Sequence, residues 1–281
     1  MMPVMDERFS AFSFVDRITA LEPGKWARGR FAIPAGLPEF STCLVAEAVG
    51  QLAAWVAMAQ AEFRRRPVAA LSGEMGIVRE AAPGEILDLG VEVESGDPDT
   101  VAFAGWARLG DTPVLALSRC VGLMLPQEDF DAPEAVRGDF ETLCGPGARP
   151  ARFGGIAKPD LLLIDRVPGQ RLRAAMTVPV SAPFFADHFP RRPVFPASLL
   201  LDAQVRLALR LARETLPPGL LRPARVADVK MRSFILPGQA VEIEAAMRSA
   251  TDGTAELSLA AMVDGKRVAT GRVEIDARVP A

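Results

Sequence analysis

The sequence predicts an α+β fold of two similar halves, in each of which a curved antiparallel sheet wraps around one long helix. Three observations predict it. The same order of strand, turn and helix signals occurs twice along the 281 residues, each copy holds one long apolar helix, and hairpin patterns follow each helix. A helix that is apolar nearly all round has to be covered on most sides, and a sheet with one polar face can cover it while facing water.

The two copies open with the same signals. Each has a short strand pattern, a Pro-Gly turn and a second strand pattern, namely Phe14–Ile18, Pro23-Gly24 and Trp26–Ile33 in the first copy and Leu163–Val167, Pro168-Gly169 and Leu172–Val178 in the second. This agreement in order and spacing indicates an internal repeat.

A long helix follows in both copies. In the first copy we expect it over Thr42–Met58 and somewhat beyond, with Ser41 or Thr42 itself as the N-cap. In the second copy we expect it over Leu199–Ala212, with Ser198 as a candidate N-cap. Pro217-Pro218-Gly219 then stops this helix, because proline cannot continue it.

Further strand patterns follow each helix and end in a hairpin. They are Met75–Arg79, Glu85–Glu94 and Val101–Leu109 with a turn at Gly110-Asp111, and then Val229–Phe234, Gln239–Met247 and Ala255–Val263 with a turn at Asp264-Gly265. We expect the two sheets to join edge to edge, because this removes an exposed edge strand from each. The chain therefore divides into an N-terminal half (1–127), a linker rich in Asp, Glu, Pro and Gly (128–159) and a C-terminal half (160–281).

Composition and charge exclude several classes of function. The formal net charge of −3 and the pI of about 5.5 argue against a nucleic-acid-binding protein, which would carry a basic footprint. Cys43, Cys120 and Cys144 stand far apart without CxxC spacing, so we expect neither a disulfide framework nor a metal site. No basic leader and no run of eighteen apolar residues occurs, so we expect a cytoplasmic protein without a membrane span.

The second half carries the motif that points to chemistry. It reads Pro183-Phe184-Phe185-Ala186-Asp187-His188-Phe189-Pro190-Arg191-Arg192-Pro193-Val194-Phe195-Pro196-Ala197-Ser198-Leu199-Leu200-Leu201-Asp202-Ala203. This segment resembles the signature of the bacterial 3-hydroxyacyl-(acyl carrier protein) dehydratases, which have the hot-dog fold. The His-Phe-Pro, the proline three residues later, the proline before the helix and the helix carboxylate are all in register. The resemblance implies a tandem double hot-dog.

The motif also departs from the family pattern. Three glycines are replaced, by Asp187, Arg191 and Ala197, which puts the local backbone path in question. The helix carboxylate is Asp202 rather than the commoner glutamate, although aspartate occurs there in one branch of the family.

The first half resembles the family more weakly and has no histidine. Gly24 to Glu47 spans 23 residues, Gly169 to Asp202 spans 33, and the shortfall falls in the loop that would carry the histidine. In family dimers the histidine of one unit works with the helix carboxylate of the other. The resemblance therefore implies that His188 works with Glu47, and it leaves Asp202 facing the position without a histidine, either as a further catalytic residue or as a relic. A same-half pair of His188 and Asp202 is the alternative.

The resemblance implies dehydration of a (3R)-hydroxyacyl thioester to a trans-2-enoyl thioester. This reaction removes a proton from C2 and the hydroxyl from C3, so it needs a base and an acid. A histidine such as His188 suits the base, and a carboxyl buried on an apolar helix, such as Glu47, is kept protonated by desolvation. The backbone N–H of Ala197 at the helix start is a candidate donor to the enolate oxygen. The carbonyl of Val194 is expected to orient the imidazole.

The same segment suggests how substrate is held. Three aromatic residues are candidates for the wall of an acyl channel: Phe184, Phe185 and Phe189. A place in the core is the alternative for Phe184 and Phe185. Two basic clusters are candidates for docking an acyl carrier protein, with a solvated face as the alternative: Arg64-Arg65-Arg66, of which Arg64 and Arg65 are chosen for docking, and Arg191-Arg192. Acyl-CoA is the alternative substrate, and no cofactor or metal is expected besides the carrier's phosphopantetheine. The chain would be an internal pseudo-dimer, and further homo-oligomerisation stays open.

Two other functions compete with dehydration. Other hot-dog proteins hydrolyse thioesters with a helix carboxylate and water, but the intact His-Phe-Pro motif speaks against this. A non-catalytic acyl-binding or partner module would explain the degenerate first half, but the retained His188 and Glu47 argue otherwise.

Overall fold

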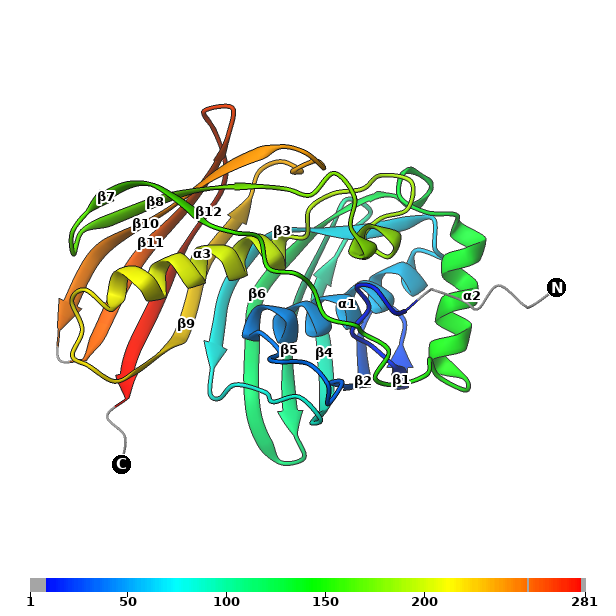
Figure 1. Ribbon diagram of the computed structural model, residues 1–281. Helices are drawn as coiled ribbons and strands as arrows, with labels where there is room; N and C mark the ends of the chain where they lie inside the picture. The colour runs from blue at the N-terminus through cyan, green and yellow to red at the C-terminus, as the bar shows by residue number, and fades with distance from the viewer. Residues whose placement is uncertain (1–8, 252, 279–281) are drawn as a thin grey trace.

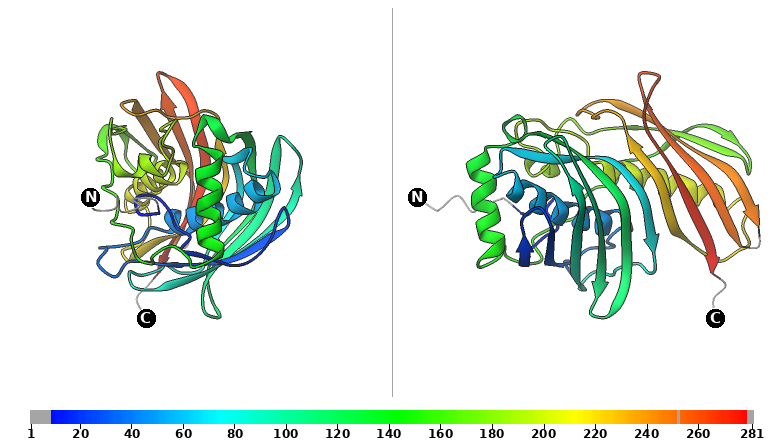
Figure 2. Two further views of the ribbon diagram at one scale, coloured as in Figure 1. Left: turned by 90° about the vertical axis from the view of Figure 1, so that its right-hand side faces the viewer. Right: turned by 180° about the vertical axis from the view of Figure 1, so that it is seen from behind.

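The computed structural model describes residues 9–251 and 253–278, and there the chain forms one antiparallel sheet that curves around two long helices (Figures 1 and 2). The first half supplies β1 (Arg17–Glu22), β2 (Trp26–Ala32), β3 (Arg65–Ile77), β4 (Ile86–Gly96), β5 (Thr100–Leu109) and β6 (Thr112–Pro126). The second half supplies β7 (Leu162–Val167), β8 (Arg171–Thr177), β9 (Leu220–Met231), β10 (Ala240–Thr251), β11 (Thr254–Val263) and β12 (Lys266–Arg278). The helices are α1 (Thr42–Gln60), α2 (Pro133–Cys144) and α3 (Ala197–Ala212).

The strand order shows the internal repeat directly. It is β1-β2-β4-β5-β6-β3-β9-β12-β11-β10-β8-β7, so the second half repeats the first in reverse about the β3–β9 junction. The Pro-Gly turns repeat as well. Gly24 and Gly169 have φ of +71° and +65°, and Gly84 and Gly238 have φ of +88° and +81°, a region that favours glycine. The expected α+β double hot-dog is confirmed.

The helix α1 is the central helix of the first half. It begins after Ser41, whose hydroxyl accepts a hydrogen bond from Cys43 N at 3.1 Å, as the N-cap signal predicted. Among the described helices it alone is long and apolar enough to cross a membrane. Its apolar residues are instead buried against β2, β3, β4 and β5, which is how a core helix of a globular unit packs.

The helix α3 has the same place in the second half. The prediction of Ser198 as its N-cap is wrong. Pro196 holds the cap position, and Ser198 is the second helical residue, buried and directed to the other half. The helix ends at Ala212, before the predicted stop at Pro217-Pro218-Gly219.

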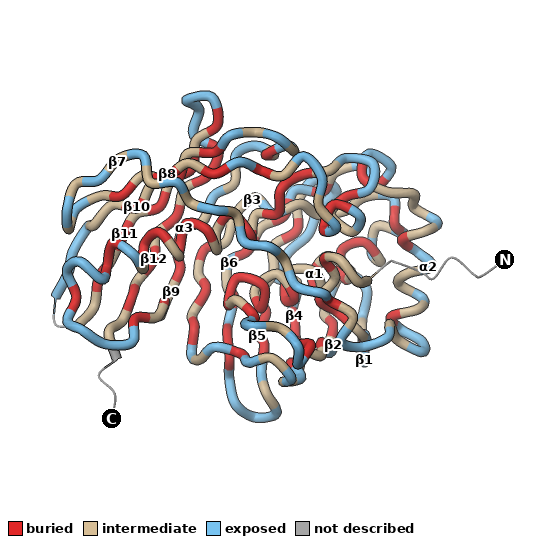
Figure 3. The backbone as a smooth tube through the Cα atoms, in the orientation of Figure 1, coloured by how far each residue is buried: buried red, intermediate tan, exposed pale blue. Residues whose placement is uncertain are grey.

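The halves join through the sheet and through a shared core. Strands β3 and β9 pair antiparallel from Leu71↔Lys230 to Gly76↔Arg225, which is the edge-to-edge junction expected from the sequence. The helices α1 and α3 contact each other inside, and one hydrophobic cluster includes buried residues of both halves. Figure 3 shows buried segments in both halves of the chain. The halves therefore share one continuous sheet and one apolar core.

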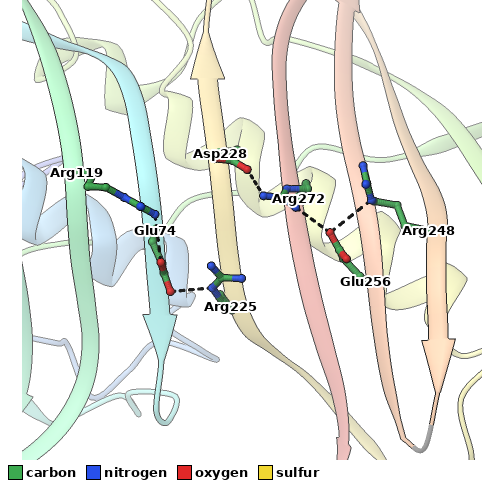
Figure 4. A network of polar contacts seen from close by, with 7 residues as sticks. All are labelled: Glu74, Arg119, Arg225, Asp228, Arg248, Glu256 and Arg272. Carbon is green, nitrogen blue, oxygen red and sulfur yellow. Dashed lines mark hydrogen bonds and ion pairs between the residues drawn. The ribbon is translucent and has the colours of Figure 1, made fainter.

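Ion pairs cross the junction on the polar face of the sheet (Figure 4). Glu74 on β3 lies 2.7 Å from Arg225 on β9 and 3.3 Å from Arg119 on β6. The row continues over the second half through Asp228, Arg272, Glu256 and Arg248. Exposed pairs of this kind contribute little individually, so the backbone ladder and the apolar core account for most of the junction.

The segment between the halves is more structured than a plain linker. After a short 3-10 turn, η1 (Gln127–Asp129), it forms α2, whose Phe140 packs against Trp55 and Phe63 of the first half at ring distances of 6.1 and 5.2 Å. Charged and proline residues are frequent in this stretch, but four apolar side chains anchor it: Phe130, Val136, Leu143 and Phe153 are all buried.

Candidate active site

A cavity of about 580 Å³ is lined by residues of both halves. Its wall is mainly apolar and includes the middle of α1, the strands β3, β5 and β6, the start of α3 and the loop before it. His188 and Glu47 both line this cavity, and Asp202 does not. The structure therefore brings the histidine of the second half and the glutamate of the first half to one space.

His188 is held by the loop that precedes α3. Its backbone N–H donates to Phe184 O at 2.9 Å, after the 3-10 turn η2 (Pro183–Ala186), and its Nδ1 lies 3.2 Å from Val194 O. Because a carbonyl oxygen can only accept, Nδ1 carries the proton and the lone pair of the neutral ring sits on Nε2. Burial, with the nearby guanidinium of Arg66, lowers the pKa of His188 to about 4. The ring is therefore neutral at pH 7 and able to accept a proton.

Glu47 lies in the middle of the apolar helix α1. Gln51, one turn later, donates from Nε2 to Glu47 Oε1 at 3.1 Å, and the hydroxyl of Ser198 at the start of α3 lies beside the carboxyl. Burial raises the pKa of Glu47, and this effect exceeds that of the two polar neighbours, which lower it. The carboxyl is thus biased toward its protonated form, which can donate a proton.

The repeat places a second carboxyl, that of Asp202, at the position of α3 that corresponds to Glu47 in α1. Glu47 and Asp202 each lie five residues after the first residue of their helix, and each faces the start of the opposite helix. Glu47 is beside Ser198, and Asp202 is close enough to Cys43 to raise the pKa of its thiol further. Asp202 pairs with Arg206 at 3.3 Å. Since His188 is the only histidine of the chain, no imidazole can serve this position.

The linker covers this second position. Phe153 packs against Phe14 and Phe40 at ring distances of 5.0 and 6.1 Å. Farther along, Arg206 donates to Pro159 O at 3.0 Å, and Lys158 forms an ion pair with Glu39. Linker residues therefore occupy the region beside the shortened loop of the first half.

The three residues that replace family glycines all have negative φ. Asp187 has φ −99° and ψ −23°, and neither Arg191 nor Ala197 has a positive φ, so none of the three positions needs glycine. Ala197 is the first residue of α3 and lines the cavity. The first N–H groups of a helix have no partner within it, so this N–H suits a developing oxyanion. That role stays a prediction.

Of the three aromatic residues expected in the channel wall, only Phe189 lines the cavity. The expectation for Phe184 and Phe185 is wrong. Both are buried in the core, with ring centroids 4.5 Å apart, and Phe184 also packs against Phe195 at 6.1 Å. Apolar residues in a motif look alike in sequence whether they face a core or a channel.

The docking candidates lie at the surface with partners of their own. Arg64 pairs with Glu62 at 2.5 Å, and Arg65 pairs with Asp99 at 3.1 Å. The other two candidates lie near Phe130: Arg191 and Arg192 are both exposed, Arg191 N donates to Phe130 O at 3.0 Å, and the Arg192 guanidinium lies 5.6 Å from the Phe130 ring. Their role in docking stays a prediction.

Arg66 lines the site, whereas the sequence placed it only in a basic cluster. Its guanidinium lies 3.9 Å from the centre of the Phe189 ring and 5.7 Å from that of Phe130, and it lines the cavity. Burial lowers the pKa of Arg66 to about 10, but the side chain remains charged at neutral pH. Its place in a run of three arginines suggested a solvated cluster. The alternation of a strand, which turns every second side chain inward, was the signal that could have found it.

Comparison with known proteins supports the motif and the fold separately. A family model described as a FabA-like domain matches residues 156–272. The 3-hydroxyacyl-(acyl-carrier-protein) dehydratase FabZ of Shewanella sp. (strain W3-18-1) is 36% identical over 115 residues, which cover 37% of this chain and 75% of that protein. FabZ of Escherichia coli (strain K12 / DH10B) is 33% identical over 115 residues, covering 38% of this chain and 76% of that protein.

Solved structures extend the likeness to both halves. A putative oleoyl thioesterase from Lactobacillus plantarum has a TM-score of 0.62 at 12% identity and covers 91% of this chain and 97% of its own. The tesB protein of Mycobacterium avium subs paratuberculosis has a TM-score of 0.58 at 12% identity, covering 93% and 96%. Identity this low speaks for the fold alone. Because three quarters of a FabZ sequence align at 36% identity, the chain belongs to the hot-dog 3-hydroxyacyl-(acyl-carrier-protein) dehydratase family.

Proposed function

We propose that the protein dehydrates a (3R)-hydroxyacyl thioester to a trans-2-enoyl thioester, with His188 as the base and Glu47 as the acid. One observation carries the proposal. A neutral imidazole from one half and a carboxyl biased toward protonation from the other line a single, mainly apolar cavity. The lowered pKa of His188 favours a neutral imidazole and the raised pKa of Glu47 favours a protonated carboxyl, which are the protonation states that these roles need before the reaction.

The reaction then runs as follows. Nε2 of His188 takes the proton from C2, and the thioester oxygen gains negative charge opposite the N–H of Ala197 at the start of α3. The electrons form the C2–C3 double bond as the C3–O bond breaks, and Glu47 gives its proton to the leaving hydroxyl, which departs as water. Imidazolium and carboxylate remain. A proton passing from His188 to Glu47 restores both groups.

The acyl group is proposed to arrive on the phosphopantetheine of an acyl carrier protein in the cytoplasm. The FabZ relatives are named for substrates on that carrier. The exposed Arg191 and Arg192 at the loop that holds His188 suit an anionic partner. Acyl-CoA is the other candidate, and fatty-acid or polyketide assembly is the proposed setting.

The test supplies 3-hydroxyacyl thioesters of graded chain length, on carrier protein and on CoA, to the wild type and to His188→Ala. Enoyl thioester and free thiol are measured in parallel by mass spectrometry. We expect enoyl product without thiol, and a loss of ~10²-fold or more in His188→Ala. Thiol release without enoyl formation would identify a thioesterase instead. Binding without either product would identify a non-catalytic module.

A further inference from the structure

The segment Phe9–Val15, here called the strap, is fastened to the loop that carries His188. A single carboxylate oxygen, Oδ2 of Asp187, accepts three hydrogen bonds from the strap. The donors are Ala11 N at 3.0 Å, Phe12 N at 2.7 Å and the hydroxyl of Ser13 at 3.2 Å. Asp187 directly precedes His188 in the chain, so the strap is fixed beside the imidazole.

The strap is also fastened to the helix that carries Glu47. Gln51 Oε1 accepts from Phe14 N at 2.8 Å, and Gln51 Nε2 donates to Phe12 O at 2.9 Å. The same amide nitrogen donates to Glu47 at 3.1 Å. The strap therefore connects the immediate neighbours of the base and the acid, which come from opposite halves of the protein.

These contacts place the ring of Phe12 against the imidazole. The two ring centroids are 5.3 Å apart at an interplanar angle of 75°, and Phe12 is 2% exposed while lining the cavity. Phe189 stacks on the imidazole at 4.1 Å. His188 thus has an aromatic ring on each of two sides, and one of these rings is held there by the strap.

We propose that Asp187 is a positioning residue for the active site: its carboxylate fixes the strap so that Phe12 covers the imidazole of His188 and keeps water from it. This inference rests on the proposed function for its catalytic part. The three hydrogen bonds that Asp187 accepts from the strap are here called the clamp. At this position the family pattern has glycine, which has no side chain to accept them. Since the backbone at 187 does not need glycine, the carboxylate is an addition that the local fold accommodates.

Removing the clamp should change the environment of the imidazole more than its charge. Burial is the largest cause of the low pKa of His188, and Arg66 is the charged group that adds to it. The strap itself, from Phe9 to Val15, has no charged side chain. The other titratable groups of the cavity come from the remaining elements around it: Cys43, Glu47, Cys120, Asp131, Asp139, Asp187 and Arg232. Loss of the Asp187 charge alone would lower the pKa of His188, whereas entry of water would raise it.

The experiment compares Asp187→Gly and Asp187→Asn with the wild type. Glycine restores the family residue and removes the clamp, while asparagine removes the charge but keeps an acceptor oxygen. Asp97→Gly is the matched control. Asp97 also accepts two backbone N–H bonds and one hydroxyl bond, from Asp99 and Thr100, but in a turn that does not line the cavity.

Two measurements do not depend on activity. Because His188 is the only histidine, its NMR signal in untagged protein reports its protonation without ambiguity. Hydrogen exchange reports the amides of Ala11 and Phe12. In Asp187→Gly we expect faster exchange of both amides and a His188 pKa higher by at least ~1 unit, with kcat lower by ~10-fold. Asp187→Asn should leave the His188 pKa at or slightly below that of the wild type, because it removes the charge but keeps an acceptor oxygen, and Asp97→Gly should keep that pKa unchanged.

The outcomes separate the inference from the proposed function. Exchange that stays slow in Asp187→Gly, or a His188 pKa that falls or stays constant there, overturns the clamp. An equal rise of that pKa in Asp187→Asn overturns it too, because the acceptor oxygen would then be irrelevant. If the wild type has no dehydratase activity but the two spectroscopic results hold, the clamp stands and the proposed function fails.

Discussion

The two helix carboxyls offer a matched pair of substitutions, Glu47→Gln and Asp202→Asn. Both replace a carboxyl by an amide of the same size at equivalent positions of α1 and α3. Only Glu47 lines the cavity that contains His188, whereas Asp202 is engaged with Arg206. We expect Glu47→Gln to abolish most activity and Asp202→Asn to leave kcat/KM within about threefold of the wild type, since a group outside the cavity adds nothing to proton transfer.

The size of the loss follows from the role. A positioned general acid contributes ~10²- to 10⁴-fold, which at 1.36 kcal/mol per tenfold is ~2.7 to 5.5 kcal/mol of transition-state free energy. The thermal stability of the Glu47→Gln protein should not fall along with its activity. Because burial raises the pKa of Glu47, the ionised carboxyl destabilises the folded state above that pKa, and glutamine removes this effect. At pH 8 the Glu47→Gln protein should therefore melt at the wild-type temperature or above it.

The assay is the pH dependence of kcat/KM for a 3-hydroxyacyl thioester, with thermal melting of the same samples. The base must be deprotonated, so activity rises as pH passes the His188 pKa of about 4. The acid must be protonated, so activity falls as pH passes the raised pKa of Glu47. The alkaline fall should disappear from the residual activity of Glu47→Gln. Full activity in Glu47→Gln together with a large loss in Asp202→Asn would refute the cross-half pairing.

Three further predictions concern the fold. Glu74→Ala and Arg225→Ala should show a coupling in a double-mutant cycle of thermal stability that vanishes near ~1 M salt, because the pair is exposed; coupling that is independent of salt would contradict this. Burial raises the pKa of Asp16 to about 6 although its carboxylate accepts from Ala32 N at 2.6 Å. Stability should therefore fall as pH rises from 4 to 6, and Asp16→Asn should gain roughly 1–2 kcal/mol at pH 8 but nothing at pH 4, as urea unfolding at the two values would show. Of the three cysteines only Cys144 is exposed, so a thiol reagent should label one site quickly and the other two only after unfolding; fast labelling of more than one site would argue against the buried placements.

Much of the architecture could be predicted because it depends on local signals that occur twice. The Ser41 cap, the Pro-Gly turns at Gly24 and Gly169 and the alternating strands each have a physical cause within a few residues. The meeting of His188 with Glu47 could not be derived in this way. Their separation along the chain is large, and only the family geometry suggested that the two helices bring them together.

The sequence-based predictions failed where a residue type suits two different environments. Ser198 reads as a cap, but Pro196 starts the helix earlier, and the hydroxyl lies beside Glu47 instead. Phe184 and Phe185 read as channel residues but fill the core. The strap was missed because no short-range pattern links Phe12 to a carboxylate 175 positions later in the chain. Long-range polar contacts of this kind depend on the completed fold.

The linker beside the Asp202 position affects how many substrate molecules one chain can bind. A symmetric dimer of single hot-dog units must present two identical sites, and any change to one is made to both. In this fused chain the two positions differ: the linker contacts the Asp202 position, since Arg206 pairs with Asp202 and donates to Pro159 O, while the Glu47 position opens to the cavity that contains His188. The chain should accordingly engage one carrier at a time, and a tight-binding substrate analogue should titrate one equivalent per polypeptide rather than two.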